Sequence, residues 1–290
     1  MRPRLAAAAL LGVTAVWGST FFLIRDLLDR VPAADFLAVR FAIATVAMLA
    51  LAPRAISRLS PLARRRSAYA GAVYGVAQIL QTTGLAHTPA SISGFITGLY
   101  VVATPVLAAL AFGQRVSRSI WIAVALSTIG LGILSLRGFS VGFGEAVTFV
   151  AAILYAVHIV LLSRWSSARD AYAMATIQMG VITVLCLIVA VPGGLTLPHT
   201  SQDWIAVVYM ALAAGALAMV VQTWAQSHLD APRSALLMTM EPVFAAGFAA
   251  TFGGESLGPR VVLGGLLVLA AMVLAERSGR AAAALHAHLD

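Results

Sequence analysis

Apolar runs long enough to cross a bilayer fill most of this sequence, and short gaps rich in Pro, Gly, Ser and Arg separate them. Hydrophobic residues make up 61% of the 290 residues and charged residues only 10%, whereas soluble domains are about 25% charged. A water-soluble fold could not cover so much apolar surface with so few charges, so the expected solvent is the lipid bilayer. The sequence therefore predicts an all-α polytopic membrane protein with ten transmembrane helices. These cover residues 5–25, 34–52, 68–86, 91–112, 119–136, 143–163, 172–191, 204–226, 234–254 and 260–276.

The first run follows Arg2 and Arg4, as in a signal peptide, but it continues for about 20 residues, the length of a full span. We therefore expect an uncleaved first helix. The net charge of +8 does not indicate a nucleic-acid partner, because the arginines lie in short gaps and form no basic face. Cys186 is the single cysteine, which excludes an internal disulfide and a cysteine-based metal site. No metal or cofactor is expected.

The distribution of arginine between alternate gaps predicts the orientation in the membrane. One side carries fourteen arginines: Arg2, Arg4, Arg54, Arg58, Arg64, Arg65, Arg66, Arg115, Arg118, Arg164, Arg169, Arg233, Arg277 and Arg280. The other side carries four: Arg25, Arg30, Arg137 and Arg260. The positive-inside rule then places both termini in the cytoplasm of a multi-pass protein of the cell (plasma or inner) membrane.

The two halves of the chain repeat each other. An offset of 138 residues aligns Trp17 with Tyr155, and the same offset aligns Arg40 with Gln178 inside the second helix of each half. Five helices per half is an odd number, so the second copy enters the membrane inverted, as in many secondary transporters. We expect a first repeat at 1–138, a second at 139–280 and a cytoplasmic tail at 281–290.

Motif order points to a family. WGSTF in the first helix, VRF in the second, prolines in the fourth and ninth, and EPVFAA followed by GGESL resemble the EamA family of the drug/metabolite transporter superfamily. The resemblance runs from about Leu5 to Glu276 and implies a ten-helix secondary transporter that exports amino acids or other small metabolites. It also implies that the last helix of each repeat lies outside the substrate-lining bundle and can serve a homodimer contact. Gln114 stands where such repeats often carry Glu, as Glu255 does in the second half, so we infer a structural role for this loop acid.

Polar residues inside the apolar runs are the candidates for function. Because lipid cannot hydrogen-bond them, those that share a helical face are expected to point inward. The expected topology puts Arg40, Gln78 and Gln81 in the outer half of the bilayer. It puts His158, Gln178, Gln222 and Glu241 in the inner half. The expected substrate-binding residues are Trp17, Arg40, Tyr74, Gln78, Gln81, Thr97, Tyr100, Tyr155, His158, Gln178, Gln222 and Glu241.

Glu241 is followed at once by Pro242 in the ninth apolar run. A carboxylate at that depth persists only where it faces protein, substrate or water, and the proline frees the backbone carbonyl one turn earlier. Three roles stay open for Glu241: a structural acid, a substrate contact and a proton carrier. Arg40 either contacts a substrate carboxylate or extends to the interface. Pro105 and Pro242 are expected hinges.

The leading hypothesis is a secondary transporter that exports a small metabolite by alternating access, with proton coupling open. The second is an uncoupled facilitator or uptake permease, which differs in the role of Glu241. A membrane-embedded enzyme is disfavoured because His87, His158, His199 and His228 are scattered and offer no metal-ligand or catalytic spacing. A membrane scaffold would not need converging polar faces.

Overall fold

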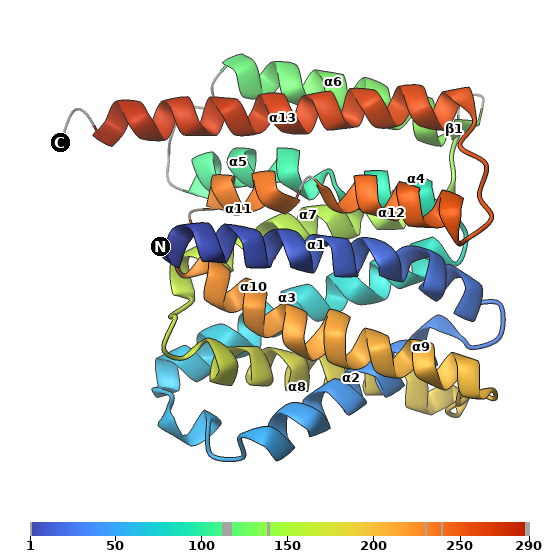
Figure 1. Ribbon diagram of the computed structural model, residues 1–290, viewed down its shortest axis with the longest axis vertical. Helices are drawn as coiled ribbons and strands as arrows, with labels where there is room; N and C mark the ends of the chain where they lie inside the picture. The colour runs from blue at the N-terminus through green and yellow to red at the C-terminus, as the bar shows by residue number, and fades with distance from the viewer. Residues whose placement is uncertain (1, 112–117, 138–139, 230, 239, 288–290) are drawn as a thin grey trace.

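The computed structural model describes residues 2–111, 118–137, 140–229, 231–238 and 240–287, and these residues are mainly helical. Its helices lie side by side in layers (Figure 1), and α1 begins on the same side of the bundle on which α13 ends. The only strands in the described ranges are two residues long, β1 (Leu136–Arg137) and β2 (Ser140–Val141), which pair as an antiparallel hairpin between two helices. The chain is thus an all-helical protein, as the sequence predicts.

The helices follow the apolar runs closely. In chain order, the α-helices are α1 (Arg2–Leu27), α2 (Ala33–Leu51), α3 (Pro61–Leu85), α4 (Ala90–Thr97), α5 (Tyr100–Ala111), α6 (Arg118–Ser135), α7 (Phe143–Trp165), α8 (Ala171–Ala190), α9 (Ser201–Ala211), α10 (Ala218–Gln226), α11 (Ala231–Met238), α12 (Met240–Thr251) and α13 (Pro259–Ala287). Short turns of 3₁₀-helix follow α2 and α8, at η1 (Ile56–Arg58) and η2 (Val191–Gly193), and a π-helical segment, η3 (Leu212–Leu217), joins α9 to α10.

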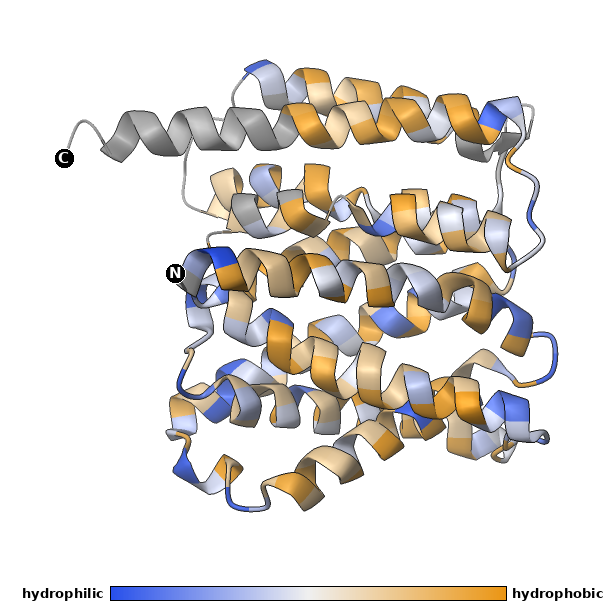
Figure 2. Cartoon of the chain, in the orientation of Figure 1, coloured by the Kyte–Doolittle hydropathy of each residue, from blue (hydrophilic) through white to orange (hydrophobic). Residues whose placement is uncertain are grey.

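The hydropathy of these helices matches a bilayer environment. In Figure 2 the apolar residues fill the middle of the helices, and the hydrophilic ones gather at the helix ends and loops. Among the described residues, six helices are long and apolar enough to span a membrane, and residues 121–133 and 259–274 form shorter apolar helices. Large side chains such as Ile205 and Leu110 are 71% and 67% exposed and so face lipid. The count of ten spans and the inverted repeat stay predictions.

Three of the expected helices are irregular; the prolines of the runs 91–112 and 234–254 suggested bends there, whereas nothing suggested one in the run 204–226. The run 91–112 divides into α4 and α5 at Gly98–Leu99, where the backbone tightens into i→i+3 hydrogen bonds. The run 234–254 divides into α11 and α12, and the run 204–226 contains the π-helical segment. Apolar periodicity does not register such breaks, because lipid-facing and buried residues continue on both sides of them.

Two helix boundaries extend beyond the apolar runs. α3 begins at Pro61, seven residues before its apolar run, because the Ser60 side chain caps the helix by accepting from Ala63 N and Pro61 stands at its first turn. α13 continues as helix to Ala287, into the segment 281–290 that the sequence suggested as a tail. The expected repeat boundary at 138–139 lies outside the described residues.

Close helix packing rests on small residues. A Cβ added to Gly18 of α1 would lie 2.5 Å from Phe244 Cβ and 2.9 Å from Ala245 N of α12. Likewise, a Cβ on Gly71 of α3 would lie 2.8 Å from the Cα of Gln178 in α8. Membrane helices associate through such backbone approaches, and these two fix the helices that carry the polar residues discussed below.

Helices α6 and α13, the expected fifth and tenth, pack against each other along one edge of the bundle (Figure 1). A Cβ on Gly130 of α6 would lie 2.9 Å from the carbonyl oxygen of Gly264 in α13. This position agrees with the peripheral place that the family resemblance implied for them.

The loop acid Glu255 binds backbone rather than a side chain. Its two carboxylate oxygens accept from Ala90 N and Ser91 N, at 2.6 and 3.1 Å, at the beginning of α4. A carboxylate there satisfies free N–H groups and complements the helix dipole. The geometry supports the structural role inferred for Glu255; Gln114, its counterpart, lies outside the described residues.

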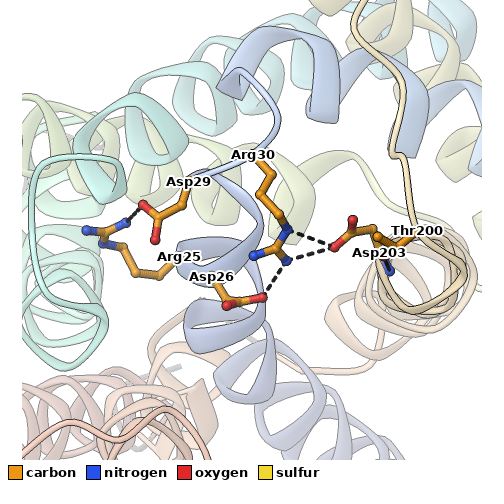
Figure 3. A network of polar contacts seen from close by, with 6 residues as sticks. All are labelled: Arg25, Asp26, Asp29, Arg30, Thr200 and Asp203. Atoms are coloured by element: carbon orange, nitrogen blue, oxygen red, sulfur yellow. Dashed lines mark hydrogen bonds and ion pairs between the residues drawn. The ribbon is translucent and has the colours of Figure 1, made fainter.

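A network of ion pairs joins the end of α1 to the beginning of α9 (Figure 3). Arg30 Nη2 lies 2.7 Å from Asp26 Oδ2 and 2.7 Å from Asp203 Oδ1, and Arg30 Nε also donates to Asp203. Hydrogen bonds that Arg30 donates to Asp26 first, and then to Asp203, raise the pKa of its guanidinium above the ordinary value. The Asp203 side chain is only 4% exposed, whereas the separate pair Arg25–Asp29 is open to solvent at 37% and 67%.

This contrast predicts different effects for two arginine substitutions. Arg30→Gln is expected to lower the free energy of unfolding by roughly 1–2 kcal/mol. The Asp203 carboxylate, which water hardly reaches, would lose its charged partner. Arg25→Gln removes an exposed pair and is expected to change it by less than about 0.5 kcal/mol. Detergent-solubilised protein unfolded by heat or denaturant gives both values. Equal losses in the two variants would contradict this account.

Candidate functional site

A cavity lies in the middle of the bundle, between α1, α2, α3, α4, α5, α7, α10, α11 and α12. Its volume is about 40 Å³, enough for water and smaller than a typical small-molecule site, so a metabolite requires the cavity to widen. Its lining residues are Trp17, Thr20, Phe21, Ile24, Arg40, Tyr74, Gln78, Gln81, Thr97, Tyr100, Tyr155, His158, Ile159, Gln222, Met238 and Glu241.

Eleven of the twelve residues predicted to bind substrate line this cavity. Gln178 does not: its Oε1 lies 2.8 Å from His158 Nε2, so it can act on a cavity ligand only through His158. Residues expected at two different depths, such as Arg40 and His158, line the same cavity. Their binding of a substrate stays a prediction.

Arg40 is 3% exposed, and its Nε donates to the carbonyl oxygen of Met210 at 3.1 Å. Its guanidinium carbon lies 5.0 Å from the centre of the Phe41 ring, a cation–π contact. Within the described ranges the ion pairs are Arg25–Asp29, Arg30–Asp26 and Arg30–Asp203. Arg40 therefore faces the cavity as a buried cation that no described carboxylate neutralises.

The π-helical segment explains the backbone contacts of two cavity residues. Met210 precedes η3, and the Trp17 Nε1–H donates to the carbonyl oxygen of Ala214 within it, at 2.9 Å. A π-helical turn shifts the helical hydrogen bonds from i→i+4 to i→i+5, and such turns are frequent at functional sites. The irregular turn thereby offers carbonyl oxygens that hold Trp17 and Arg40 in place.

Glu241 is 6% exposed and enters the cavity from the first turn of α12. Tyr100 Oη lies 2.7 Å from Glu241 Oε2 and 3.0 Å from the carbonyl oxygen of Met238. The residue four positions after Met238 is Pro242, which has no N–H to donate. The freed carbonyl that the sequence predicted is therefore met by a tyrosine hydroxyl from another helix.

Hydrogen bonds and ring contacts connect the polar faces of α3, α4 and α7. Tyr155 Oη donates to Gln81 Oε1 at 2.8 Å, and Gln81 Nε2 donates to Thr97 Oγ1 at 3.0 Å. The Tyr74 ring lies 5.4 Å from the Tyr155 ring and 4.8 Å from the His158 ring, centre to centre. These residues form an aromatic and amide wall whose polar atoms are largely satisfied by one another.

Gln222 differs from that wall. It is 1% exposed, and its Oε1 makes no hydrogen bond within the described parts of the chain. A buried acceptor without a donor is unfavourable unless a ligand or water reaches it. Gln222 lines the cavity, so its free acceptor is a candidate contact for a ligand N–H.

The two expected hinges lie differently with respect to the helix breaks. Pro242 is the third residue of α12, whereas Pro105 lies inside continuous α5, seven residues beyond the break at Gly98. The Gly98 break lies beside Pro242, because a Cβ on Gly98 would lie 3.0 Å from Pro242 Cγ. Bending at either proline stays a prediction.

Sequence reasoning missed five lining residues, namely Thr20, Phe21, Ile24, Ile159 and Met238. Three of them follow Trp17 by three, four and seven positions in α1, which places them on its helical face. That spacing was a usable signal, but Thr20, Phe21 and Ile24 look like ordinary membrane residues.

A bundle of apolar helices around a central polar cavity is typical of membrane transport proteins. The sequence profile of the EamA-like transporter family matches residues 4–136 and again residues 142–276. The chain belongs to this family. It is a multi-pass membrane protein.

Relatives with curated descriptions are transporters by name. An uncharacterized transporter from Archaeoglobus fulgidus is 27% identical over 267 residues, covering 90% of this chain and 82% of the relative. A probable terminal-alkyne amino-acid exporter from Streptantibioticus cattleyicolor is 27% identical over 285 residues, 94% and 93% of the two chains. The uncharacterized inner membrane transporter YedA of Escherichia coli K12 is 26% identical over 259 residues, 86% and 83%.

A solved crystal structure has the same fold. It superposes with a TM-score of 0.69 at 17% sequence identity and covers 93% of this chain and 95% of its own. At that identity the likeness concerns the fold alone.

Proposed function

We propose that this protein is a secondary transporter that exports small zwitterionic metabolites of the amino-acid type across the cytoplasmic membrane by alternating access. The observation that carries the proposal is a pair of opposite buried charges on one cavity. Arg40 and Glu241 both line it, are 3% and 6% exposed, and form no ion pair with each other.

An unpaired charge inside a membrane protein is unfavourable unless a ligand compensates it. A bound α-amino acid carries a carboxylate, which suits the two free nitrogens of the Arg40 guanidinium. Its ammonium group suits Glu241 and the free acceptor of Gln222. A zwitterion thus compensates both charges, whereas a singly charged ligand compensates one.

The apolar part of the wall defines the side chain of the ligand. Trp17, Phe21, Ile24 and Ile159 line the cavity without a polar atom free for a ligand, because the Trp17 N–H is already bonded to Ala214. We therefore expect an apolar or amphipathic side chain on the substrate. The probable amino-acid exporter from S. cattleyicolor, similar along nearly its whole length, supports both the substrate class and the direction.

Alternating access needs two halves that move against each other. Thr45 of α2 and Thr183 of α8, separated by the same 138 positions that relate the two halves, share a hydrogen bond of 2.9 Å. Contact between repeat-related residues is what a pseudo-two-fold axis at that point requires. This supports the two-repeat organisation at 1–138 and 139–280. The arginine distribution supports the cytoplasmic position of both termini.

Two further partners belong to the proposal. The lipid bilayer surrounds the exposed apolar side chains of the bundle. A second copy of the chain, bound through the fifth or tenth helix, is the proposed homodimer contact, because α6 and α13 lie at the edge and α6 exposes Trp121 and Ile129 at 58% and 57%.

Thermal stabilisation of the detergent-purified protein tests the substrate class. Leucine is expected to raise the unfolding temperature, because a ligand that binds the folded state stabilises it. Isoamylamine and 4-methylpentanoate, which lack the carboxylate or the ammonium group, are expected to stabilise much less at the same concentration. If either analogue matches every zwitterion in a panel of neutral amino acids, the proposed recognition is wrong.

A further inference from the structure

The Tyr100 hydroxyl contacts both a cavity acid and a backbone carbonyl that lacks its usual helical donor. Tyr100 is the first residue of α5, directly after the Gly98–Leu99 break, and it is 2% exposed. Its oxygen lies 2.7 Å from Glu241 Oε2 and 3.0 Å from the carbonyl oxygen of Met238, the last residue of α11. One hydroxyl therefore contacts both the last residue of α11 and the first turn of α12.

A tyrosine hydroxyl has one proton to donate. When Glu241 is ionised, both neighbouring oxygens are acceptors, and they compete for that proton. The carboxylate is the stronger acceptor because the hydrogen bond is charge-assisted. The Met238 carbonyl then has no donor from Tyr100, and its usual helical donor is missing at Pro242.

Protonation of Glu241 removes the competition. The carboxyl O–H can donate to the Tyr100 oxygen, and the Tyr100 O–H is then free to donate to the Met238 carbonyl. The carboxyl group, the hydroxyl and the carbonyl are then all satisfied in one series of hydrogen bonds, at distances usual for O–H···O bonds. The Met238 carbonyl is therefore held by Tyr100 in one protonation state of Glu241 and released in the other.

We propose that Tyr100 is a positioning residue that relays the protonation state of Glu241 to the Met238 carbonyl at the end of α11, so that proton exchange and the movement of α12 are linked. This rests on the proposed function, in which Glu241 lines the transport cavity. It assigns the coupling ion as a proton, and the moving part is α12, which carries Glu241 and Pro242.

The surroundings of Glu241 contain few other groups that could respond to pH. Arg40 from α2, Tyr74 from α3, and Tyr155 and His158 from α7 line the same cavity. From α1 the cavity receives Trp17, Thr20, Phe21 and Ile24, and from α4 it receives Thr97, none of which titrates. His158 is the group that an experiment near neutral pH must separate from Glu241.

Spin labels report the movement without a substrate. Gly247 of α12 is exposed, and a Cβ added there meets no atom within 4 Å; Ile188 of α8 is 64% exposed. Cysteines at these two positions, with Cys186→Ala, give a distance distribution in lipid nanodiscs by pulsed electron paramagnetic resonance. The parent protein is expected to shift its distribution between pH 5 and pH 8.

Three variants test which residues cause that shift. Tyr100→Phe is expected to abolish it, because the ring remains and only the relay is lost. Glu241→Gln is expected to hold the low-pH distribution at both pH values, since the amide donates to Tyr100 as the protonated acid does. With His158→Gln the shift persists if Glu241 is its source and disappears if His158 is.

A parent protein without a shift, a Tyr100→Phe variant that shifts normally, or a shift lost with His158 would each overturn the relay. If Tyr100→Phe does not fold, the Glu241→Gln distribution decides. Amino-acid flux into liposomes reports separately on the proposed function: no flux with a normal pH shift rejects the substrate class alone, and flux without the shift rejects the relay alone.

Discussion

Replacing Arg40 with glutamine is expected to weaken the transport of a neutral amino acid roughly 10- to 100-fold in apparent affinity. The loss of a buried, charge-assisted contact to the substrate carboxylate corresponds to about 1.5–3 kcal/mol. Glutamine is shorter and neutral, so neither the charge nor the paired nitrogens remain. Counterflow of labelled leucine in proteoliposomes measures the change.

Arg40→Lys separates charge from geometry in the same assay. Lysine keeps the positive charge but has no Nε to donate to Met210 and no planar fork for a carboxylate. Activity between that of the parent and that of Arg40→Gln is expected. Unchanged affinity in Arg40→Gln would mean that Arg40 serves only to hold the π-helical segment.

A methyl group at position 18 is expected to destabilise the protein by about 1–3 kcal/mol, as overpacking does in tight cores. The Cβ of Gly18→Ala would lie 2.9 Å from Ala245 N and 3.1 Å from the carbonyl oxygen of Glu241. Both are backbone atoms and cannot rotate away, so α1 and α12 must separate. Because Trp17 and Glu241 come from these helices, the cavity is expected to change as well.

Gly12→Ala is the matched control in the same helix, since a Cβ at Gly12 meets no atom within 4 Å. It is expected to leave the unfolding temperature unchanged or raise it slightly, because alanine favours helix. The two unfolding temperatures, measured in one detergent, test the packing of α1 against α12. Equal temperatures would show that these helices are not in close contact.

The sequence was most informative where the cost of burying a polar group in lipid decides the outcome. Arg40, Gln78 and Glu241 interrupt apolar runs, and that alone required them to face inward, where the structure places them. Gln178 followed the same rule, but the rule does not say which polar residue reaches a cavity and which supports a neighbour. The contact with His158 decides that.

Backbone irregularities were the least predictable features. Pro105 suggested a bend, yet α5 continues through it and the break lies at Gly98, where Pro242 approaches. The π-helical segment consists of ordinary apolar residues, LAAGAL, so its local sequence carries no signal. Such features arise from packing between distant helices, and they hold Trp17 and Arg40 in place.

The most direct test of the central claim is the movement of an amino acid by the purified protein. Proteoliposomes preloaded with unlabelled leucine are expected to accumulate labelled leucine by counterflow, with isoamylamine and 4-methylpentanoate as weak competitors. Gln222→Leu, which removes the free acceptor, is expected to slow accumulation without abolishing it. If a panel of neutral amino acids gives no counterflow above protein-free liposomes, the proposed transport of zwitterions by the Arg40–Glu241 cavity is contradicted.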